Sequence, residues 1–209
     1  PKQVIFTSGA TESNNMLLKG YAPNRRILIS ATEHSSVIDA GIDAELIPVL
    51  DSGLVDLKAL KNLLDQDNRP SFVAIMTVNN ETGVIQPIKE ISNLLSDYDC
   101  IFHTDAAQAI GRIPIHFPSM GVEFLSLSGH KIGGPQGVGS VIMRNGANPP
   151  TLLDGGGQER RQRAGTENVA AIHGLGIACK IALNNLDNFQ KLKLYRDQIE
   201  NALKASHPD

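Results

Sequence analysis

The sequence predicts an α/β fold in which a mostly parallel, seven-stranded sheet is sandwiched by helices. Short apolar runs alternate with segments of helical periodicity along most of the chain. The runs are nearly continuous in apolar residues, which is typical of strands buried on both faces of a sheet. Polar, Gly and Pro residues separate the two kinds of segment, as expected for connecting turns.

Each predicted element follows from its own pattern. Apolar runs predict seven strands over residues 4–6, 27–29, 45–49, 72–78, 101–102, 124–127 and 138–143. Spacings of three and four, as in Leu57, Leu60 and Leu64, predict helices over 12–20, 35–40, 57–64 and 88–95. Gly20 is expected to end the first helix, and Pro87 stands near the start of the fourth.

The pattern changes near residue 168, which divides the chain. We expect residues 1–167 to form a ligand-binding α/β domain and residues 168–209 to form one long helix or two consecutive ones. The chain begins with Pro1 rather than Met, directly before a strand-like run, and it ends straight after a helical pattern. We therefore expect a fragment of a longer protein.

Composition excludes several classes of protein. Hydrophobic residues make up 41% and charged residues 20%, a globular balance, and the net charge of −3 provides no basic field for nucleic acid. The apolar stretches are much shorter than the ~20 residues of a membrane-spanning helix, so we expect no membrane span. Two cysteines form neither a disulfide framework nor a four-thiolate zinc site, so we expect no metal and a reducing, cytoplasmic setting.

Polar clusters follow five of the predicted strands. In open α/β sheets, ligands bind beyond the carboxyl ends of the strands, and these clusters fall at those ends. They occupy residues 8–11, 33–34, 79–81, 105–108 and 128–131. The first cluster places Gly9 before a helix whose free N–H groups could bind a phosphate, although an ordinary strand–helix turn has the same pattern.

Lys131 lies in a Gly-rich loop after a predicted buried strand. Such a lysine can be partly desolvated, which makes its neutral amine available for a Schiff base. Taken alone, a surface lysine is the more common explanation. Asp105 could pair with a protonated ring nitrogen or cap a helix, and His34 could contact a cofactor ring or be structural. Asn80 and Gln108 could bind a cofactor hydroxyl or bond within their loops.

The order of these motifs is more specific than any one of them. Together they resemble the cysteine desulfurases of the nitrogenase and iron–sulfur-cluster types, within the aminotransferase class V group. The resemblance covers nearly the whole chain. It is carried by residues 7–15, 32–34, 78–83, 103–108, 128–131 and 155–168.

The resemblance implies the large domain of a pyridoxal-phosphate-dependent transferase of fold type I. Lys131 would hold pyridoxal phosphate as a Schiff base, Asp105 would pair with its ring nitrogen, and His34 would stack on the ring. Gln108 would contact the phenolic oxygen, with Asn80 beside it. The residues implied to bind the cofactor around its phosphate are Ala10, Thr11, Ser128, Gly129 and His130.

The resemblance also implies a homodimer in which Thr166 reaches the phosphate of the neighbouring subunit. Arg160, Arg161 and Arg163, which precede Thr166, could equally be a solvated basic patch. Cysteine desulfurases convert L-cysteine to L-alanine, and an enzyme thiolate takes the sulfur as a persulfide for an iron–sulfur scaffold or another acceptor. Cys100 and Cys179 match no catalytic position, and we expect both to be unreactive thiols of the core.

In this family the nucleophilic cysteine lies in a C-terminal small domain, which should follow the long helical segment and is missing here. The resemblance therefore implies that these 209 residues are inactive alone. Other functions stay open: a selenocysteine lyase, another class V aminotransferase, or a non-catalytic desulfurase-like interaction protein. A nucleotide-binding α/β protein is disfavoured, because no Gly-x-Gly-x-x-Gly or Gly-Lys-Ser/Thr motif is present.

Overall fold

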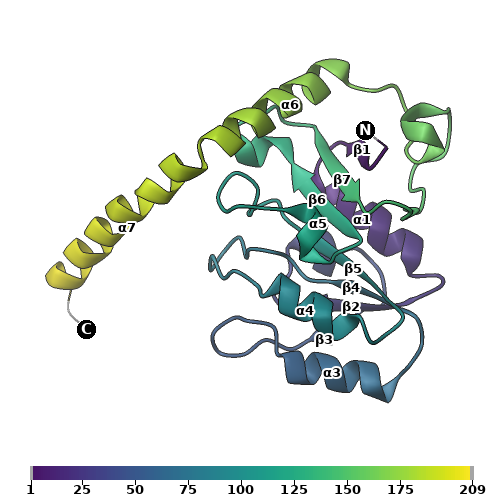
Figure 1. Ribbon diagram of the computed structural model, residues 1–209, viewed down its shortest axis with the longest axis horizontal. Helices are drawn as coiled ribbons and strands as arrows, with labels where there is room; N and C mark the ends of the chain where they lie inside the picture. The colour runs from purple at the N-terminus through teal and green to yellow at the C-terminus, as the bar shows by residue number, and fades with distance from the viewer. Residues whose placement is uncertain (1, 208–209) are drawn as a thin grey trace.

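A single twisted sheet forms the centre of the computed structural model (Figure 1). The structure describes residues 2–207, so Pro1 and residues 208–209, the outer ends of the two predicted segments, lie outside the described residues. Within the described range, seven strands pair in the order β1-β7-β6-β5-β4-β2-β3. They are β1 Val4–Thr7, β2 Arg26–Ser30, β3 Glu45–Ile47, β4 Ser71–Ala74, β5 Cys100–Asp105, β6 Phe124–Ser128 and β7 Gly139–Met143.

Most neighbouring strands run in the same direction. The pairs from β3 through β2, β4 and β5 to β6 are parallel, whereas β7 is antiparallel to both β6 and β1. The predicted α/β class with a mostly parallel sheet is confirmed. Three strands are shorter than predicted: β3 ends before Pro48, which has no N–H to donate to a ladder, β4 ends at Ala74, and β7 begins one residue late, at Gly139.

Helices connect the strands, and their bounds agree broadly with the predicted ranges. Asp56 begins one of them by accepting hydrogen bonds from the N–H groups of Lys58 and Ala59. One short helix, α5, and two 3₁₀ turns were not predicted, because each spans only one turn. The elements of the described chain are α1 Ala10–Tyr21, α2 Ser35–Ile38, α3 Leu57–Gln66, α4 Ile88–Leu95, α5 Phe117–Met120, α6 Val169–Asn184, α7 Leu186–Ser206, η1 Gly129–Ile132 and η2 Gln158–Arg161.

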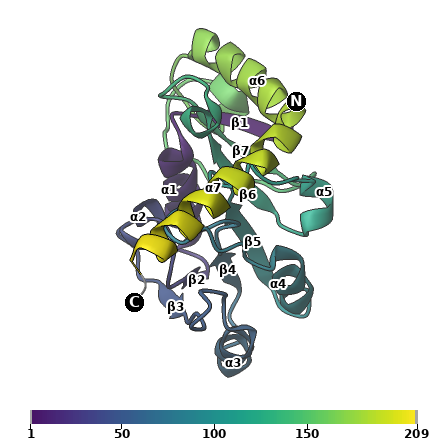
Figure 2. The same cartoon turned by 90° about the vertical axis from the view of Figure 1, so that its left-hand side faces the viewer.

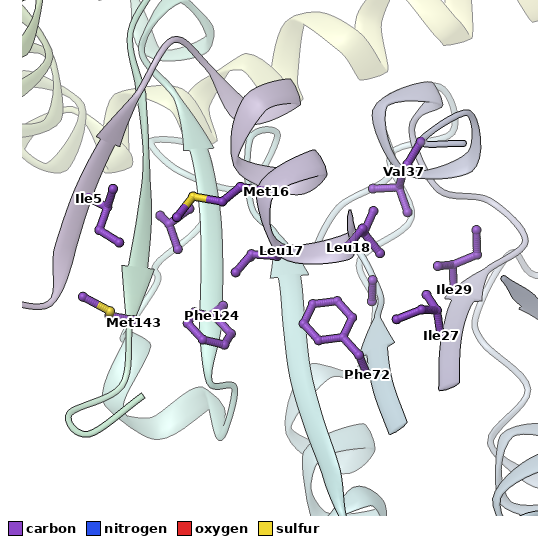
Figure 3. Packing of buried hydrophobic residues seen from close by; sticks show 13 residues of the cluster. Ile5, Met16, Leu17, Leu18, Ile27, Ile29, Val37, Phe72, Phe124 and Met143 are labelled. Atoms are coloured by element: carbon purple, nitrogen blue, oxygen red, sulfur yellow. The ribbon is translucent and has the colours of Figure 1, made fainter. Parts of the chain in front are cut away.

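Helices cover both faces of the sheet, α1 and α2 on one side and α4 and α5 on the other (Figure 2). Alternate strand residues point to opposite faces, so each strand supplies both cores. On the α1 face, Leu17 and Leu18 pack toward Phe72 and Phe124 (Figure 3). On the other face, the apolar sides of α3 and α4 pack on residues such as Val73, and α6 packs near the β6 end of the sheet.

The C-terminal helices differ from the rest of the fold. α6 packs on the sheet through Ala171, Leu175 and Ala178, whereas α7 buries none of its described residues and projects away from the sheet (Figure 1). Its exposed side chains include apolar ones such as Tyr195. Within residues 2–207 no single helix is long and apolar enough to cross a membrane. Taken together α6 and α7 reach that length and composition, with a bend of 64° between them.

Candidate active site

A cavity of about 660 Å³ lies where β5 and β6 end and where α1, α2 and η1 begin. This volume is within the ordinary range for a small-molecule site. The parallel strands bring their carboxyl ends to one edge of the sheet, so segments far apart in sequence meet there. The predicted residues that line the cavity are Ala10, Thr11, His34, Asn80, Asp105, Gln108, Ser128, His130 and Lys131.

The turn before α1 exposes the first N–H groups of that helix to the cavity. These groups have no acceptor inside the helix, and the helix dipole adds partial positive charge. Gly9 lies close to β7, because a Cβ on Gly139 would come within 2.6 Å of Gly9 Cα. Only a residue without a side chain fits at Gly139. Ser128 Oγ lies beside the same turn and is 3.0 Å from His130 Nδ1.

Glu12 closes the first turn of α1 and connects it to a distant segment. Its carboxylate accepts the Ser8 N–H at 2.7 Å and two hydrogen bonds from Arg163, at 2.8 and 3.1 Å. Burial raises the pKa of Glu12, but the hydrogen bonds from Arg163 and Ser8 outweigh it and leave the pKa below its usual value. Arg163 is therefore paired rather than part of a solvated patch, while Arg160 donates to the Val4 carbonyl and Arg161 is exposed.

Asp105 is a buried carboxylate at the end of β5. Its Oδ1 accepts the Ala107 N–H at 2.8 Å, and its Oδ2 accepts Asn14 Nδ2 at 2.7 Å. Burial raises the pKa of Asp105 above its usual value, although these hydrogen bonds and the nearby positive charge of Lys131 lower it. A cation placed in the cavity beside Asp105 would stabilise the ionised form.

Two residues of this site were missed in the sequence, Asn14 and Ser36. Asn14 is fully buried and donates to Ser36 Oγ at 2.9 Å as well as to Asp105. Ser36 lines the cavity and bonds to His34 Nδ1 through both its N–H and its hydroxyl. A signal for Asn14 does exist, because it precedes Leu17 and Leu18 by three and four positions and so lies on the apolar face of α1.

Lys131 lies on η1, after β6, with its side chain in the cavity lining. The side chain is exposed, so this structure has the surface lysine that the sequence left open and not a partly desolvated one. The reason is local: η1 carries Lys131 beyond the buried end of β6. Asn80 is also exposed and donates to Glu81 Oε1 at 2.8 Å, the kind of bonding within a loop that the sequence left open.

Two predicted residues are not in the cavity lining. Gly129 is buried at the start of η1, where a Cβ would come within 3.0 Å of the Pro135 carbonyl oxygen. Thr166 is exposed and lines a separate, smaller cavity beside Ser8 and Gly137. The predicted contact of Thr166 with a neighbouring subunit stays a prediction.

Glu33, which directly precedes His34, belongs to a polar cluster found in the sequence but was given no role there. Its Oε1 accepts the Met76 N–H at 2.6 Å, and its Oε2 has no hydrogen-bond partner among residues 2–207. Complete burial raises the pKa of Glu33 well above its usual value. Burial therefore favours the neutral form of this carboxyl group, which directly precedes the cavity residue His34.

The two thiols lie elsewhere. Neither Cys100 nor Cys179 lines the main cavity, and both are half-buried. Burial raises the pKa of Cys100 to about 11 and also raises the pKa of Cys179. Among the described residues, no group of three His, Cys, Asp or Glu side chains is arranged to hold a metal ion.

Comparison with known proteins identifies the family. The model of the aminotransferase class-V family matches residues 1–206. The chain belongs to this family. Human cysteine desulfurase is 42% identical to the chain over 221 aligned positions, which cover 98% of this chain and 48% of the human protein. The chain thus spans about half the length of the curated relatives that it matches.

Solved structures of NifS-like proteins, among others, have the same fold. The NifS-like protein of Rickettsia africae superposes with a TM-score of 0.93 at 40% identity, over 99% of this chain and 58% of that one. SspA in complex with cysteine superposes with a TM-score of 0.74 at 36% identity, over 86% of this chain and 55% of SspA. The fold is therefore that of NifS-like proteins.

Class-V aminotransferases use pyridoxal phosphate, and the residues present here fit that group. The cavity provides an amine at Lys131, a helix N-terminus for a phosphate and a buried carboxylate at Asp105. Asp105 is the strongest support for this cofactor. Burial disfavours the negative charge of its carboxylate, and the positive charge of a protonated ring nitrogen would stabilise it. The cavity therefore has the chemistry that the cofactor requires.

Proposed function

We propose that the protein containing this chain is a pyridoxal-phosphate-dependent cysteine desulfurase. It converts L-cysteine to L-alanine and passes the sulfur, as an enzyme persulfide, to an iron–sulfur scaffold or another acceptor. The observation that carries the proposal is the cavity that Lys131, Asp105 and His34 line together with the start of α1. The names of the relatives support the reaction, and the cysteine bound to SspA supports the substrate.

The residues of the cavity divide the chemistry among themselves. Pyridoxal phosphate, when bound, supplies an electron sink for the charge left on the substrate Cα. Lys131 binds the cofactor covalently and moves the proton at Cα, because its amine lies in the same cavity. Asp105 holds the proton on the ring nitrogen, and His34 packs against the ring. Ala10, Thr11, Ser128 and His130 bind the phosphate, and Gln108 binds the phenolic oxygen with Asn80 beside it.

Sulfur transfer requires a thiol that residues 2–207 do not place at the cavity. Cys100 and Cys179 lie outside the lining, and burial keeps both protonated. In the transfer, the substrate carbon–sulfur bond breaks, a sulfur–sulfur bond forms to the acceptor thiol, and the proton of that thiol ends on alanine. We propose that the nucleophilic cysteine belongs to the half of the protein that this chain does not span, and that residues 1–209 do not turn over cysteine alone.

The remaining parts of the proposal concern organisation. Residues 1–167 are the cofactor domain, and residues 168–209 lead to a small domain, in keeping with relatives about twice as long. The protein is a homodimer in which Thr166 contacts the phosphate of the partner subunit. A reducing compartment such as the cytoplasm is the proposed location, since the chain carries unpaired thiols.

The test uses the full-length protein and a matched pair of variants. With L-cysteine and a thiol reductant, the wild type should form alanine and sulfide in equal amounts, and borohydride should trap the cofactor on Lys131. Lys131→Ala should lose both the product and the adduct, whereas Lys58→Ala, a change at an exposed lysine on α3, should lose neither.

Other outcomes identify the alternatives. An adduct that persists in Lys131→Ala would mean that another lysine holds the cofactor. Turnover of selenocysteine but not cysteine would identify a selenocysteine lyase, and amino transfer to a keto acid would identify another class V aminotransferase. A folded dimer that binds no pyridoxal phosphate would support a non-catalytic interaction protein.

A further inference from the structure

Two side chains outside the proposed chemistry connect Asp105 to His34. Asn14 Nδ2 donates to Asp105 Oδ2 at 2.7 Å and to Ser36 Oγ at 2.9 Å. Ser36 Oγ lies 2.9 Å from His34 Nδ1. The four side chains form a continuous chain of hydrogen bonds from the end of β5, through α1, to the start of α2.

The direction of these hydrogen bonds follows from the donors available. The Ser36 N–H lies 3.0 Å from His34 Nδ1, and a backbone N–H can only donate. Nδ1 is therefore the acceptor, so the proton of the neutral ring is on Nε2 and the Ser36 hydroxyl also donates to Nδ1. Ser36 Oγ is then free to accept from Asn14, whose two amide hydrogens serve Ser36 and Asp105.

A purely structural role does not explain Asn14. α2 is already attached to α1 by Asn15, which donates to the Ser36 carbonyl at 3.0 Å, and by the apolar contacts of Val37. Asn14 Oδ1 is buried with no hydrogen-bond partner among residues 2–207, which costs stability that an apolar residue of similar size would not. The two N–H groups are what an asparagine adds at this position.

We propose that Asn14 and Ser36 are positioning residues that couple Asp105 to His34. Asn14 orients the Asp105 carboxylate and polarises the Ser36 hydroxyl. Ser36 then fixes the ring orientation of His34 and keeps its proton on Nε2. The expected effect on turnover rests on the proposed desulfurase function. The hydrogen-bond chain itself does not, because it is formed by these four side chains.

Nitrogen NMR of ¹⁵N-histidine in the full-length, cofactor-loaded protein tests the proposal, with the His34 signals assigned by His34→Gln. The wild type should show the Nε2–H tautomer at His34. Ser36→Ala should shift the Nδ1 resonance, and Asn14→Leu should also shift it although Asn14 does not touch the ring. In the Ser36→Ala background, Asn14→Leu should cause no further shift. The matched control Ser35→Ala, at the exposed neighbouring serine, should leave the resonance unchanged.

Several results would overturn the coupling. An Nδ1–H tautomer in the wild type refutes it without any variant, so the proposal is testable even if Asn14→Leu does not fold. An equal Asn14→Leu shift with and without Ser36 would mean that α1 itself had moved.

In turnover, Ser36→Ala should lower kcat about tenfold with little change in KM, since ring orientation affects the reacting geometry. A protein that shows the NMR pattern but does not act on cysteine would refute the proposed function and leave the coupling standing.

Discussion

We predict that the ion pair between Arg163 and Glu12 holds the segment 155–168 against the start of α1. The guanidinium donates twice to the carboxylate, at 2.8 and 3.1 Å, and the side chains are only 21% and 11% exposed. Three residues of the same segment, Glu159, Arg160 and Arg161, have left-handed backbone angles, which are unfavourable for residues with a Cβ. We therefore expect the segment to open locally when Arg163 is replaced by methionine.

The free energy lost on replacing Arg163 lies between two limits. An exposed ion pair contributes ~0–1 kcal/mol, whereas removing one partner of a buried pair costs ~3–5 kcal/mol. Glu12 keeps the Ser8 N–H and the dipole of α1 after the change, so its charge is not left without support. We expect a loss of about 1–2 kcal/mol, which corresponds to local opening that is about 5–30 times more frequent.

Hydrogen exchange of peptides from residues 155–168 measures this opening. Exchange should rise in Arg163→Met but not in Arg161→Met, because Arg161 is exposed and has no ion pair within residues 2–207. The folded pKa of Glu12 is lowered, so the stabilisation is fully present above its unfolded pKa and is lost as the pH falls through the lower folded pKa. Equal exchange in both variants, or a difference that stays the same once the pH has fallen far enough to protonate Glu12, would refute the reasoning.

Three further predictions concern the site, the thiols and the core. Asp105→Asn should weaken retention of pyridoxal phosphate and abolish turnover, since a neutral amide cannot hold the ring nitrogen protonated; normal turnover in the full-length variant would contradict this role. Cys100, with a pKa of about 11, should resist iodoacetamide at pH 8 until the protein unfolds, because ~1 in 1,000 molecules carries its thiolate; rapid labelling of the native protein would show otherwise. Phe72→Ala should lower the free energy of unfolding, measured by urea titration, by about 3–5 kcal/mol. The reason is that the ring is fully buried, with its centroid 5.0 Å from that of Tyr21 and 5.9 Å from that of His103. A loss below about 1 kcal/mol would mean that neighbouring side chains fill the cavity.

The sheet could be predicted from the sequence because burial on both faces leaves a direct trace in composition. Every predicted strand is present, since apolar runs such as the one at β4 cannot be placed elsewhere. Strand direction leaves a weaker trace. β7 is antiparallel to β6, and the length of the connection over residues 129–138 indicates this. That connection is too short for the crossover that joins two parallel strands.

The site could be predicted as far as its residues are consecutive in strand-end motifs. Lys131, Asp105 and His34 were found in this way, and the sheet edge brings them together. Asn14 could not be paired with Asp105, because a contact across 91 positions depends on how α1 lies over β5. His103 shows the opposite case: it belongs to a motif of the site, yet burial lowers its pKa to about 3 and it packs in the core against Phe72.

Several buried polar groups around the site lower the stability of the fold. Asn14 Oδ1 and Glu33 Oε2 are buried without hydrogen-bond partners among residues 2–207, and Asp105 is buried with its pKa raised. Each of these groups would be more stable in water or replaced by an apolar side chain. Asp105 lines the cavity, Asn14 bonds to Asp105, and Glu33 directly precedes the lining residue His34. The other buried atoms without partners among residues 2–207, His103 Nδ1 and Gln162 Oε1, belong to residues outside the lining. A fold selected for stability alone would not collect these polar groups at one edge, so their position is itself an argument that this edge binds a charged, hydrogen-bonding ligand.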